Sequence, residues 1–390
     1  MIKQRFMQKF LLAILLCFSV VHASHAQEKA YRVGIFASIY LDSAFIDTSY
    51  QFENQMPRYI LPGLDFVQGS MMAMDSLKSK QITFQIFDIR SEEQSIASLS
   101  ANKIFDSLDL MIGSVAGNDY KMLTDLALAH KLPFVSATFP NDGGVRNNPY
   151  TILINATLPN HISSVHRYIL SQWPTANIVW CRKKGSMEDR LQGYFNDANK
   201  GTGNSKLLNF RTVNLTDSLT TKELLPLLDS NRTNIVLAGS LDENFGRRLA
   251  QQLLPLQKSY KPQVIGMPTW ENIKELQKSD FKELAIYFSA TFYQAPNAKW
   301  GQEFTKTFTE KTFGRPSDLA SKGFELTYYF ANLLLQYGDS MMQHLNEKDF
   351  RLFTDFDFKP VSLNGTQIDY IENKRIYLLK RQQQVLTKVY

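Results

Sequence analysis

Apolar and polar positions follow a regular order along the chain, in which short apolar runs alternate with longer amphipathic stretches. The short runs are rich in Val, Ile and Phe, which is typical of strands buried on both faces. In the first half they cover residues 31–37, 82–87, 108–113 and 133–136. Between them, residues 63–77 and 119–130 repeat their apolar positions every three to four residues, as helices do. This order predicts βαβ units with parallel strands.

The same order repeats in the second half of the chain. The expected strands cover residues 177–181, 207–213, 234–238 and 263–267. The expected helices cover residues 161–171, 187–198, 218–229 and 243–257. Two such cycles predict an α/β protein with two doubly wound parallel-sheet lobes, because a parallel sheet needs helices on both faces.

The C-terminal part breaks this order. Two long helices are expected over residues 298–313 and 318–337, and Ser317 is expected to cap the second. After residue 350 the chain becomes β-rich, with strands expected at 352–358, 367–371 and 375–379. The last two are expected to pair as a hairpin.

The first 26 residues have the three parts of a secretory signal peptide. Three basic residues precede an apolar stretch at residues 10–21, which is too short to span a bilayer comfortably. Ser24 and Ala26 then provide the small side chains that signal peptidase needs. We expect residues 1–26 to be removed and the mature protein to be periplasmic; the alternative is an uncleaved anchor helix.

Composition and net charge limit the classes of function that the protein can have. The chain has 390 residues, of which 44% are apolar and 21% are charged, as in ordinary globular proteins. Its formal net charge of +6 falls to +3 when the three basic residues of the signal are removed, so no nucleic-acid partner is indicated. One of the two cysteines is also removed, and the other, Cys181, lies in an apolar run and is expected to be a buried, unreactive thiol.

Patterns typical of catalysis and metal binding are missing from the sequence. Four histidines follow the signal, and none has the spacing of a metal-binding pair. No nucleophile elbow, P-loop or Gly-rich dinucleotide motif occurs. We therefore expect no enzyme activity, no cofactor and no metal, although catalytic groups spread over distant loops would leave no such pattern.

The ordered set of segments resembles the type 1 periplasmic binding fold, as in leucine/isoleucine/valine-binding proteins of ABC transporters. The stretches that carry the resemblance are Arg32-Val-Gly-Ile-Phe, Pro62-Gly-Leu-Asp-Phe-Val-Gln-Gly, Asp109-Leu-Met-Ile-Gly-Ser-Val115, Lys131-Leu-Pro-Phe-Val-Ser-Ala-Thr138 and Asn148-Pro-Tyr-Thr-Ile152. The resemblance implies two lobes joined by three crossovers that act as a hinge. Lobe 1 would hold residues 30–156 and 287–345, and lobe 2 would hold residues 157–286 and the β-rich tail, 346–390.

A ligand site is expected at the carboxyl ends of the strands, where open parallel sheets bind ligands. Two loops there, 113–117 and 136–142, carry small hydroxyl side chains and backbone N–H groups near a helix N-terminus, which suits an anion. The alternative is that Ser114 and Thr138 only cap helices and turns. The resemblance implies that the ligand's α-carboxylate is held by Ser114, Val115, Ala116, Ser136, Ala137 and Thr138.

The expected second lobe departs from the amino-acid binders of this family. Their tyrosine after the first strand of that lobe is absent, and Lys183 and Lys184 stand there instead, which would suit a more anionic ligand. Ser240, in the loop after a later strand, is a further candidate ligand contact.

The last strand of the second cycle is followed by Trp270 and Glu271. These residues could supply an aromatic wall and a partner for an ammonium group, respectively. Asp242 or Glu243 could serve the ammonium group instead, although an acidic residue at a helix start usually compensates the helix dipole.

We expect a periplasmic solute-binding protein that closes on a small polar, carboxylate-bearing, amino-acid-like ligand and serves an inner-membrane ABC permease or a sensor. The alternative is an envelope interaction or regulatory protein whose binding cleft is degenerate. The long loop 39–61 would favour the alternative if its aromatic residues plug the cleft or form an exposed patch.

Overall fold

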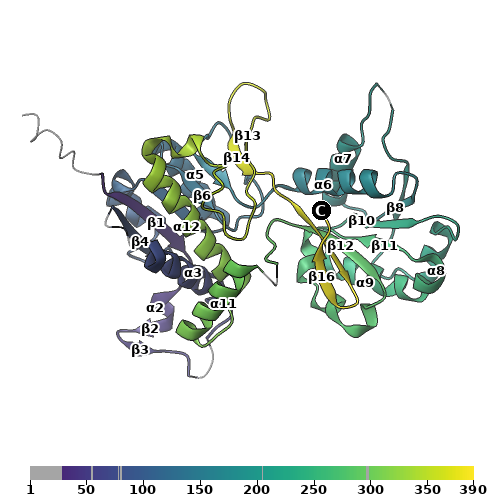
Figure 1. The fold of residues 1–390 in the computed structure, drawn as a ribbon, viewed down its shortest axis with the longest axis horizontal. Coiled ribbons are helices and arrows are strands. Elements are labelled where there is room, and N and C mark those ends of the chain that lie inside the picture. Colours follow the sequence, from purple (N-terminus) through teal and green to yellow (C-terminus); the bar gives the residue numbers. More distant parts are fainter. Residues whose placement is uncertain (1–28, 54–55, 78, 80, 204, 296–297) are drawn as a thin grey trace, which may run out of the picture.

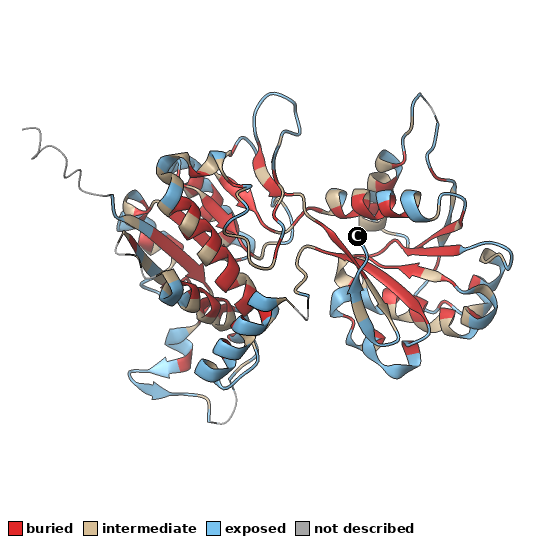
Figure 2. Ribbon diagram, viewed as in Figure 1, coloured by how far each residue is buried: buried red, intermediate tan, exposed pale blue. Residues whose placement is uncertain are grey.

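The computed structural model describes residues 29–53, 56–77, 79, 81–203, 205–295 and 298–390. They form two α/β lobes that lie side by side and are joined by three chain segments (Figure 1). The expected signal peptide lies outside the described residues. Buried residues concentrate in the strands of both lobes and in helix α12, Asp318–Tyr337 (Figure 2).

The first sheet has seven strands in the order β13-β14-β7-β6-β5-β1-β4. Their bounds are β1 Tyr31–Ala37, β4 Ile82–Asp88, β5 Leu110–Ser114, β6 Phe134–Ser136, β7 Thr151–Leu153, β13 Phe358–Val361 and β14 Tyr370–Asn373. All neighbours are parallel except β13 and β14. Chain order reverses between β1 and β5, and such a switch point is where doubly wound sheets bind ligands.

The second sheet has the order β16-β15-β12-β11-β10-β8-β9. Its strands are β8 Asn177–Arg182, β9 Phe210–Asn214, β10 Asn234–Ala238, β11 Gln263–Ile265, β12 Ala285–Ala290, β15 Tyr377–Gln382 and β16 Val385–Lys388. The strands from β9 to β12 are parallel and repeat the arrangement of the first lobe, with the switch point between β8 and β10. The expected pair of doubly wound lobes is confirmed.

Helices pack on both faces of each sheet and complete the two cores. In the first lobe they are α2 Leu41–Ala44, α3 Leu61–Leu77, α4 Ile96–Ala101, α5 Gly117–His130, α11 Lys299–Thr312 and α12. In the second they are α6 Leu158–Gln172, α7 Ser186–Ala198, α8 Thr221–Leu224, α9 Glu243–Leu253 and α10 Gln257–Tyr260. The described part also contains short 3-10 turns and a small hairpin of β2, Phe45–Ile46, with β3, Ser49–Tyr50.

Local sequence signals account for helix ends. Helix α12 begins after its expected cap, since the Ser317 hydroxyl accepts a hydrogen bond from the Ala320 N–H. The helix expected over residues 218–229 is wrong in extent: α8 is one turn and passes into a 3-10 turn at Pro226. Proline lacks the N–H that a continuing α-helix needs.

The C-terminal tail divides between the two sheets, which corrects the expected lobe boundaries. Residues 346–390 do not all belong to lobe 2, because β14 pairs with β7 and places β13 and β14 in the first sheet. Lobe 2 also extends past residue 286, because β12 belongs to the second sheet. The expected strand at 352–358 and the hairpin of 367–371 with 375–379 are wrong: the chain leaves β14 and crosses to β15, which pairs with β12.

The three crossings follow β7, β12 and β14. Glu372 is fully buried, and its Oε1 accepts hydrogen bonds from the N–H and the hydroxyl of Thr157, at 2.7 and 2.9 Å. The Asn373 side chain donates to the carbonyl oxygen of Ile154 at 3.2 Å. Buried polar groups need such partners, so these bonds fix the first crossing to the third.

Helices α3 and α12 cross in close contact over the first sheet. A Cβ atom at Gly69 would lie 1.9 Å from the carbonyl oxygen of Ala320, and one at Gly323 would lie 2.0 Å from that of Phe66. No side chain fits at either position without moving a helix, so the crossing requires both glycines.

We predict that Gly69→Ala lowers the free energy of unfolding by about 2 kcal/mol, because the added methyl group must displace α12. Gly193→Ala in α7 is the control, since a Cβ there would meet nothing within 4 Å. The control should be neutral or stabilise by up to about 1 kcal/mol through helix propensity. Urea denaturation measures both variants, and equal effects would contradict the close crossing.

A second prediction concerns His161 of α6, which is buried, with its Nδ1 2.9 Å from the hydroxyl oxygen of Ser289 on β12. Burial lowers the pKa of His161 from 6.5 to about 4, so between these values the unfolded chain binds the proton that the folded chain rejects. Stability should fall as pH drops from 6.5 toward 4, by up to about 3 kcal/mol. Urea titrations over this range should show less pH dependence in His161→Gln; an unchanged dependence would refute this assignment.

Candidate functional site

The carboxyl edge of the first sheet brings the two expected hydroxyl groups together. Ser114 ends β5 and Thr138 follows β6, and their hydroxyl oxygens lie 3.3 Å apart. Both side chains are half-buried. Each hydroxyl can donate one hydrogen bond and accept others, so the pair can still receive a ligand oxygen.

The other expected residues of this edge have different surroundings. Val115 and Ala137 are buried, and the Ala137 N–H donates to the Gly113 carbonyl at 2.9 Å, so it is not free for a ligand. Ser136 is fully buried, and its hydroxyl has no hydrogen-bond partner among the described residues. Ala116 is exposed and precedes α5. Of the six expected residues, Ser114 and Thr138 present polar side chains that remain partly accessible.

Helix α5 begins beside the hydroxyl pair. Its cap residue, Ala116, offers no side-chain acceptor, and Gly117 takes the left-handed conformation (φ +57°) that turns the loop into the helix. The first N–H groups of a helix carry partial positive charge, which favours an anion. Arg90, two residues after the end of β4, is not a free cation, because it forms an ion pair with Asp119 and donates to the Ser38 hydroxyl at 3.1 Å.

Asn155 connects this edge to two of the crossings. Its Nδ2 donates to the Thr138 carbonyl oxygen at 2.9 Å. Its Oδ1 accepts from the Thr291 hydroxyl at 3.1 Å and from the Lys322 Nζ at 2.9 Å. Asn155 lies in the first crossing, Thr291 follows β12 in the second, and Lys322 belongs to α12. One side-chain amide therefore joins the loop of Thr138 to the hinge region.

At the carboxyl edge of the second sheet, the polar side chains bond to one another. The Nζ of Lys183 lies 3.0 Å from Asp217 and 2.7 Å from Asp242, and its bond to Asp242 raises the pKa of Lys183 and lowers that of Asp242. The Ser240 hydroxyl donates to Glu188 at 2.6 Å. Lys183 is therefore not a free cation, and the Ser240 hydroxyl is not free for a ligand.

Trp270 is a core residue rather than part of an open surface. Its side chain is 1% exposed and packs against two glycines, Gly246 and Gly266, where a Cβ would lie 2.5 and 2.0 Å from the indole ring. A side chain this deeply buried cannot form the aromatic wall of an open ligand site, so this expectation for Trp270 is wrong.

The Glu271 residue is exposed, and charged groups of both lobes act on its carboxyl. Desolvation by surrounding protein and the charge of Asp318 raise the pKa of its carboxyl, while Lys322 and Arg381 oppose this shift. Asp318 and Lys322 belong to α12 of the first lobe, and Arg381 belongs to β15 of the second. The charges that act on the Glu271 carboxyl therefore come from both lobes.

Asn155 and Lys322 are not among the site residues that the sequence analysis predicts. A signal was present for each: Asn155 follows the apolar run of β7, and Lys322 is a lysine in the first turns of an otherwise apolar helix. A polar residue at the carboxyl end of a buried strand favours a site.

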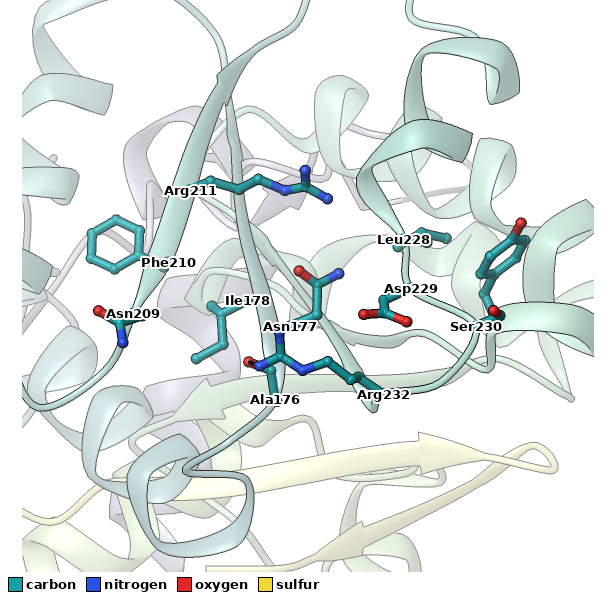
Figure 3. A pocket seen from close by; sticks show the side chains of 11 residues that line it. Ala176, Asn177, Ile178, Asn209, Phe210, Arg211, Leu228, Asp229, Ser230 and Arg232 are labelled. Atoms are coloured by element: carbon teal, nitrogen blue, oxygen red, sulfur yellow. Dashed lines mark hydrogen bonds between the residues drawn. The ribbon is translucent and has the colours of Figure 1, made fainter.

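A separate groove of about 570 Å³ lies at the opposite, amino end of the second sheet (Figure 3). Asn177 and Phe210 at the starts of β8 and β9 line it, together with Arg211 and Arg232. Both arginines donate hydrogen bonds to backbone carbonyl oxygens. They hold the loops of this lobe, and the groove lies away from the carboxyl edges.

Within the described ranges, no group of three or more His, Cys, Asp or Glu side chains could hold a metal ion. The helices of the same part of the chain include none that is long and apolar enough to cross a membrane. Cys181 is buried, as expected, and burial raises the pKa of its thiol to about 12.

Solved structures with the same arrangement of two lobes include several proteins of amino-acid transport. A protein provisionally assigned as a branched-chain amino acid ABC transporter from Rhodospirillum rubrum aligns with a TM-score of 0.67 at 10% identity, over 92% of this chain and 100% of the other. A periplasmic ligand-binding protein of a branched-chain amino acid ABC transporter from Burkholderia xenovorans aligns with a TM-score of 0.61 at 12% identity, over 92% and 94%. The chain has the type 1 periplasmic binding fold.

A third structure of this fold was solved with an amino acid bound. It is the substrate-binding protein LivJ from Streptococcus pneumoniae in complex with isoleucine, with a TM-score of 0.53 at 15% identity, over 93% of this chain and 99% of the other. No protein-family model and no curated protein sequence matches the chain. The likeness therefore concerns the type 1 periplasmic binding fold.

We predict that Asn155→Ala lowers the free energy of unfolding by about 2 kcal/mol, because it leaves the Thr138 carbonyl, the Thr291 hydroxyl and Lys322 without this partner. Asn118→Ala is the control, since Asn118 is exposed in the first turn of α5 and its side-chain amide donates to the Met122 sulfur, away from the crossings. Urea denaturation compares the two variants. An Asn155→Ala chain as stable as the control would show that the network contributes little.

Proposed function

We propose that the protein is a periplasmic solute-binding protein that closes on a small polar, carboxylate-bearing ligand of amino-acid size. The observation that carries the proposal is the hydroxyl pair of Ser114 and Thr138 beside the uncapped N-terminus of α5, at the switch point of a doubly wound sheet. Hydroxyl donors together with a helix N-terminus suit a carboxylate. No catalytic role is proposed for these groups.

The hinge would use the three crossings. The first crossing, residues 154–157, and the third, residues 374–376, connect elements of the two lobes directly, and the second leads from the end of β12 to α11. Rotation about such links closes one lobe on the other. Closing would bring the edge of the second lobe, with Glu271, over a ligand held at Thr138. The ligand would favour the closed state to the extent that it binds that state more tightly than the open one.

Location and partner follow from the same proposal. The secretory signal at residues 1–26 would deliver the chain to the periplasm. The solved structures described above are of ABC transporter proteins, which supports an inner-membrane ABC permease as the partner; a sensor is the other expected partner. In this proposal each lobe would move as one unit when the protein opens and closes.

One observation favours the alternative function, an envelope interaction or regulatory protein with a degenerate cleft. The described residues of the segment 39–61 form an arm in which Phe45, Ile46 and Tyr50 are 42%, 62% and 42% exposed. The arm projects from the lower margin of the first lobe in Figure 1. Several exposed apolar side chains in one segment are typical of a protein contact.

A thermal-shift screen over amino acids, other organic acids, peptides, sugars and inorganic anions tests the proposal. A carboxylate ligand at 100 times its Kd should stabilise the protein by about 2.7 kcal/mol and raise its Tm accordingly. Thr138→Val and Ser114→Ala should each weaken binding about tenfold, because each removes a hydrogen bond to a charged group.

Ser171→Ala is the matched control, since its hydroxyl lies on α6 and donates to the Tyr168 carbonyl, away from the proposed site. It should bind like the wild type. A flat screen, combined with capture of an envelope protein through the arm 39–61, would support the alternative instead.

A further inference from the structure

Lys322 stands close to the proposed carboxylate site. Its Nζ donates to Asn155 at 2.9 Å, and Asn155 in turn donates to the Thr138 carbonyl at 2.9 Å. Two hydrogen bonds thus separate the ammonium from the residue that is proposed to hold the ligand. Lys322 is half-buried, so water screens its charge less than it would screen that of a fully exposed lysine.

The ammonium of Lys322 has unused capacity for an anion. It carries three N–H donors, and one neutral acceptor, the Asn155 oxygen, is its hydrogen-bond partner among the described residues. No carboxylate in the described part of the chain lies within 4.0 Å of it, although Glu271, Asp318 and Glu325 are near enough to stabilise its charge. Burial lowers the pKa of Lys322, and the charges of Glu271, Asp318 and Glu325 oppose this shift without cancelling it.

One of the nearby carboxylates, Glu325, already has other hydrogen-bond partners. Glu325 is buried and accepts hydrogen bonds from the Phe353 N–H and from the N–H and hydroxyl of Thr354. Glu271, the expected partner of a ligand ammonium, lies near both Lys322 and Arg381. Lys183, by contrast, is held between two carboxylates of its own lobe. Unlike Lys183, Lys322 therefore has no carboxylate within 4.0 Å among the described residues.

We propose that Lys322 selects the class of ligand: the site takes an organic acid with an oxygen acceptor at the α-position and disfavours the zwitterionic α-amino acid of the same shape. The inference rests on the proposed function. A carboxylate held by Ser114 and Thr138 would point its α-substituent toward Lys322, which the Asn155 amide connects to the Thr138 carbonyl. An oxygen there can accept a hydrogen bond from Nζ, whereas an ammonium there meets a like charge.

Matched probes separate this inference from the proposed function. The pairs are 4-methyl-2-oxopentanoate against L-leucine, 2-oxoglutarate against L-glutamate, and pyruvate against L-alanine, each titrated calorimetrically into the mature chain. At least one oxo acid should bind the wild type about tenfold or more tightly than its amino acid. Lys322→Met should reduce that ratio to about twofold or less, and Lys322→Arg should keep most of it.

Lys299→Met is the control, because Lys299 is 86% exposed on α11 and should leave the ratio unchanged. Lys322→Gln, which keeps a polar group of similar length, replaces the methionine variant if that chain does not fold. Tighter binding of the amino acid, or a ratio that survives loss of the Lys322 charge, would overturn this inference while leaving the proposed function standing. If no acid and no amino acid binds, the proposed function fails and this inference fails with it.

Discussion

The side chains of Asn155, Glu372 and Asn373 hold together the three segments that pass between the lobes. Glu372 and Asn373 fix the first crossing to the third, and Asn155 fixes the first to the second. A buried amide or carboxylate without a partner costs free energy, so each of these bonds determines where its segment must run. Because Asn155 also holds the Thr138 carbonyl, the proposed site and the hinge share one side chain. A change at the site is therefore connected directly to the segments about which the lobes would rotate.

The two lobes have the same strand order but offer different carboxyl edges. In the first lobe, Ser114 and Thr138 keep bonding capacity, and α5 starts without a side-chain cap. In the second, Lys183 is neutralised by Asp217 and Asp242. An edge whose polar groups already satisfy one another gains little from a ligand, because new bonds would replace existing ones. We infer that a ligand would bind first to the first lobe, and that the second would cover it.

Sequence alone was enough for those parts of the fold that depend on local pattern. Apolar runs bounded by amphipathic stretches predict the parallel strands, and Ser317 predicts the start of α12. The tail could not be divided correctly, because the pairing of β14 with β7 is a contact between distant segments. The same holds for the site. Ser114 and Thr138 can be predicted because each stands at or after the end of a strand. The contact of Lys322 with Asn155 cannot, because 167 positions of sequence separate them. Trp270 was misjudged because its burial depends on two glycines that leave room for the indole ring.

The placement of Lys322 argues for a role beyond packing. Its neighbour Gly323 lies against α3 so closely that no Cβ is tolerated, which fixes α12 and with it the direction in which Lys322 leaves the helix. A lysine on the outer face of α12 would avoid desolvation, but Lys322 is half-buried with one neutral acceptor close by. Burial of the Lys322 charge costs free energy, and an anion bound beside it in the proposed site would offset that cost. A charge held in advance loses little freedom on binding, so rigid packing at Gly323 would increase ligand affinity as well as stability.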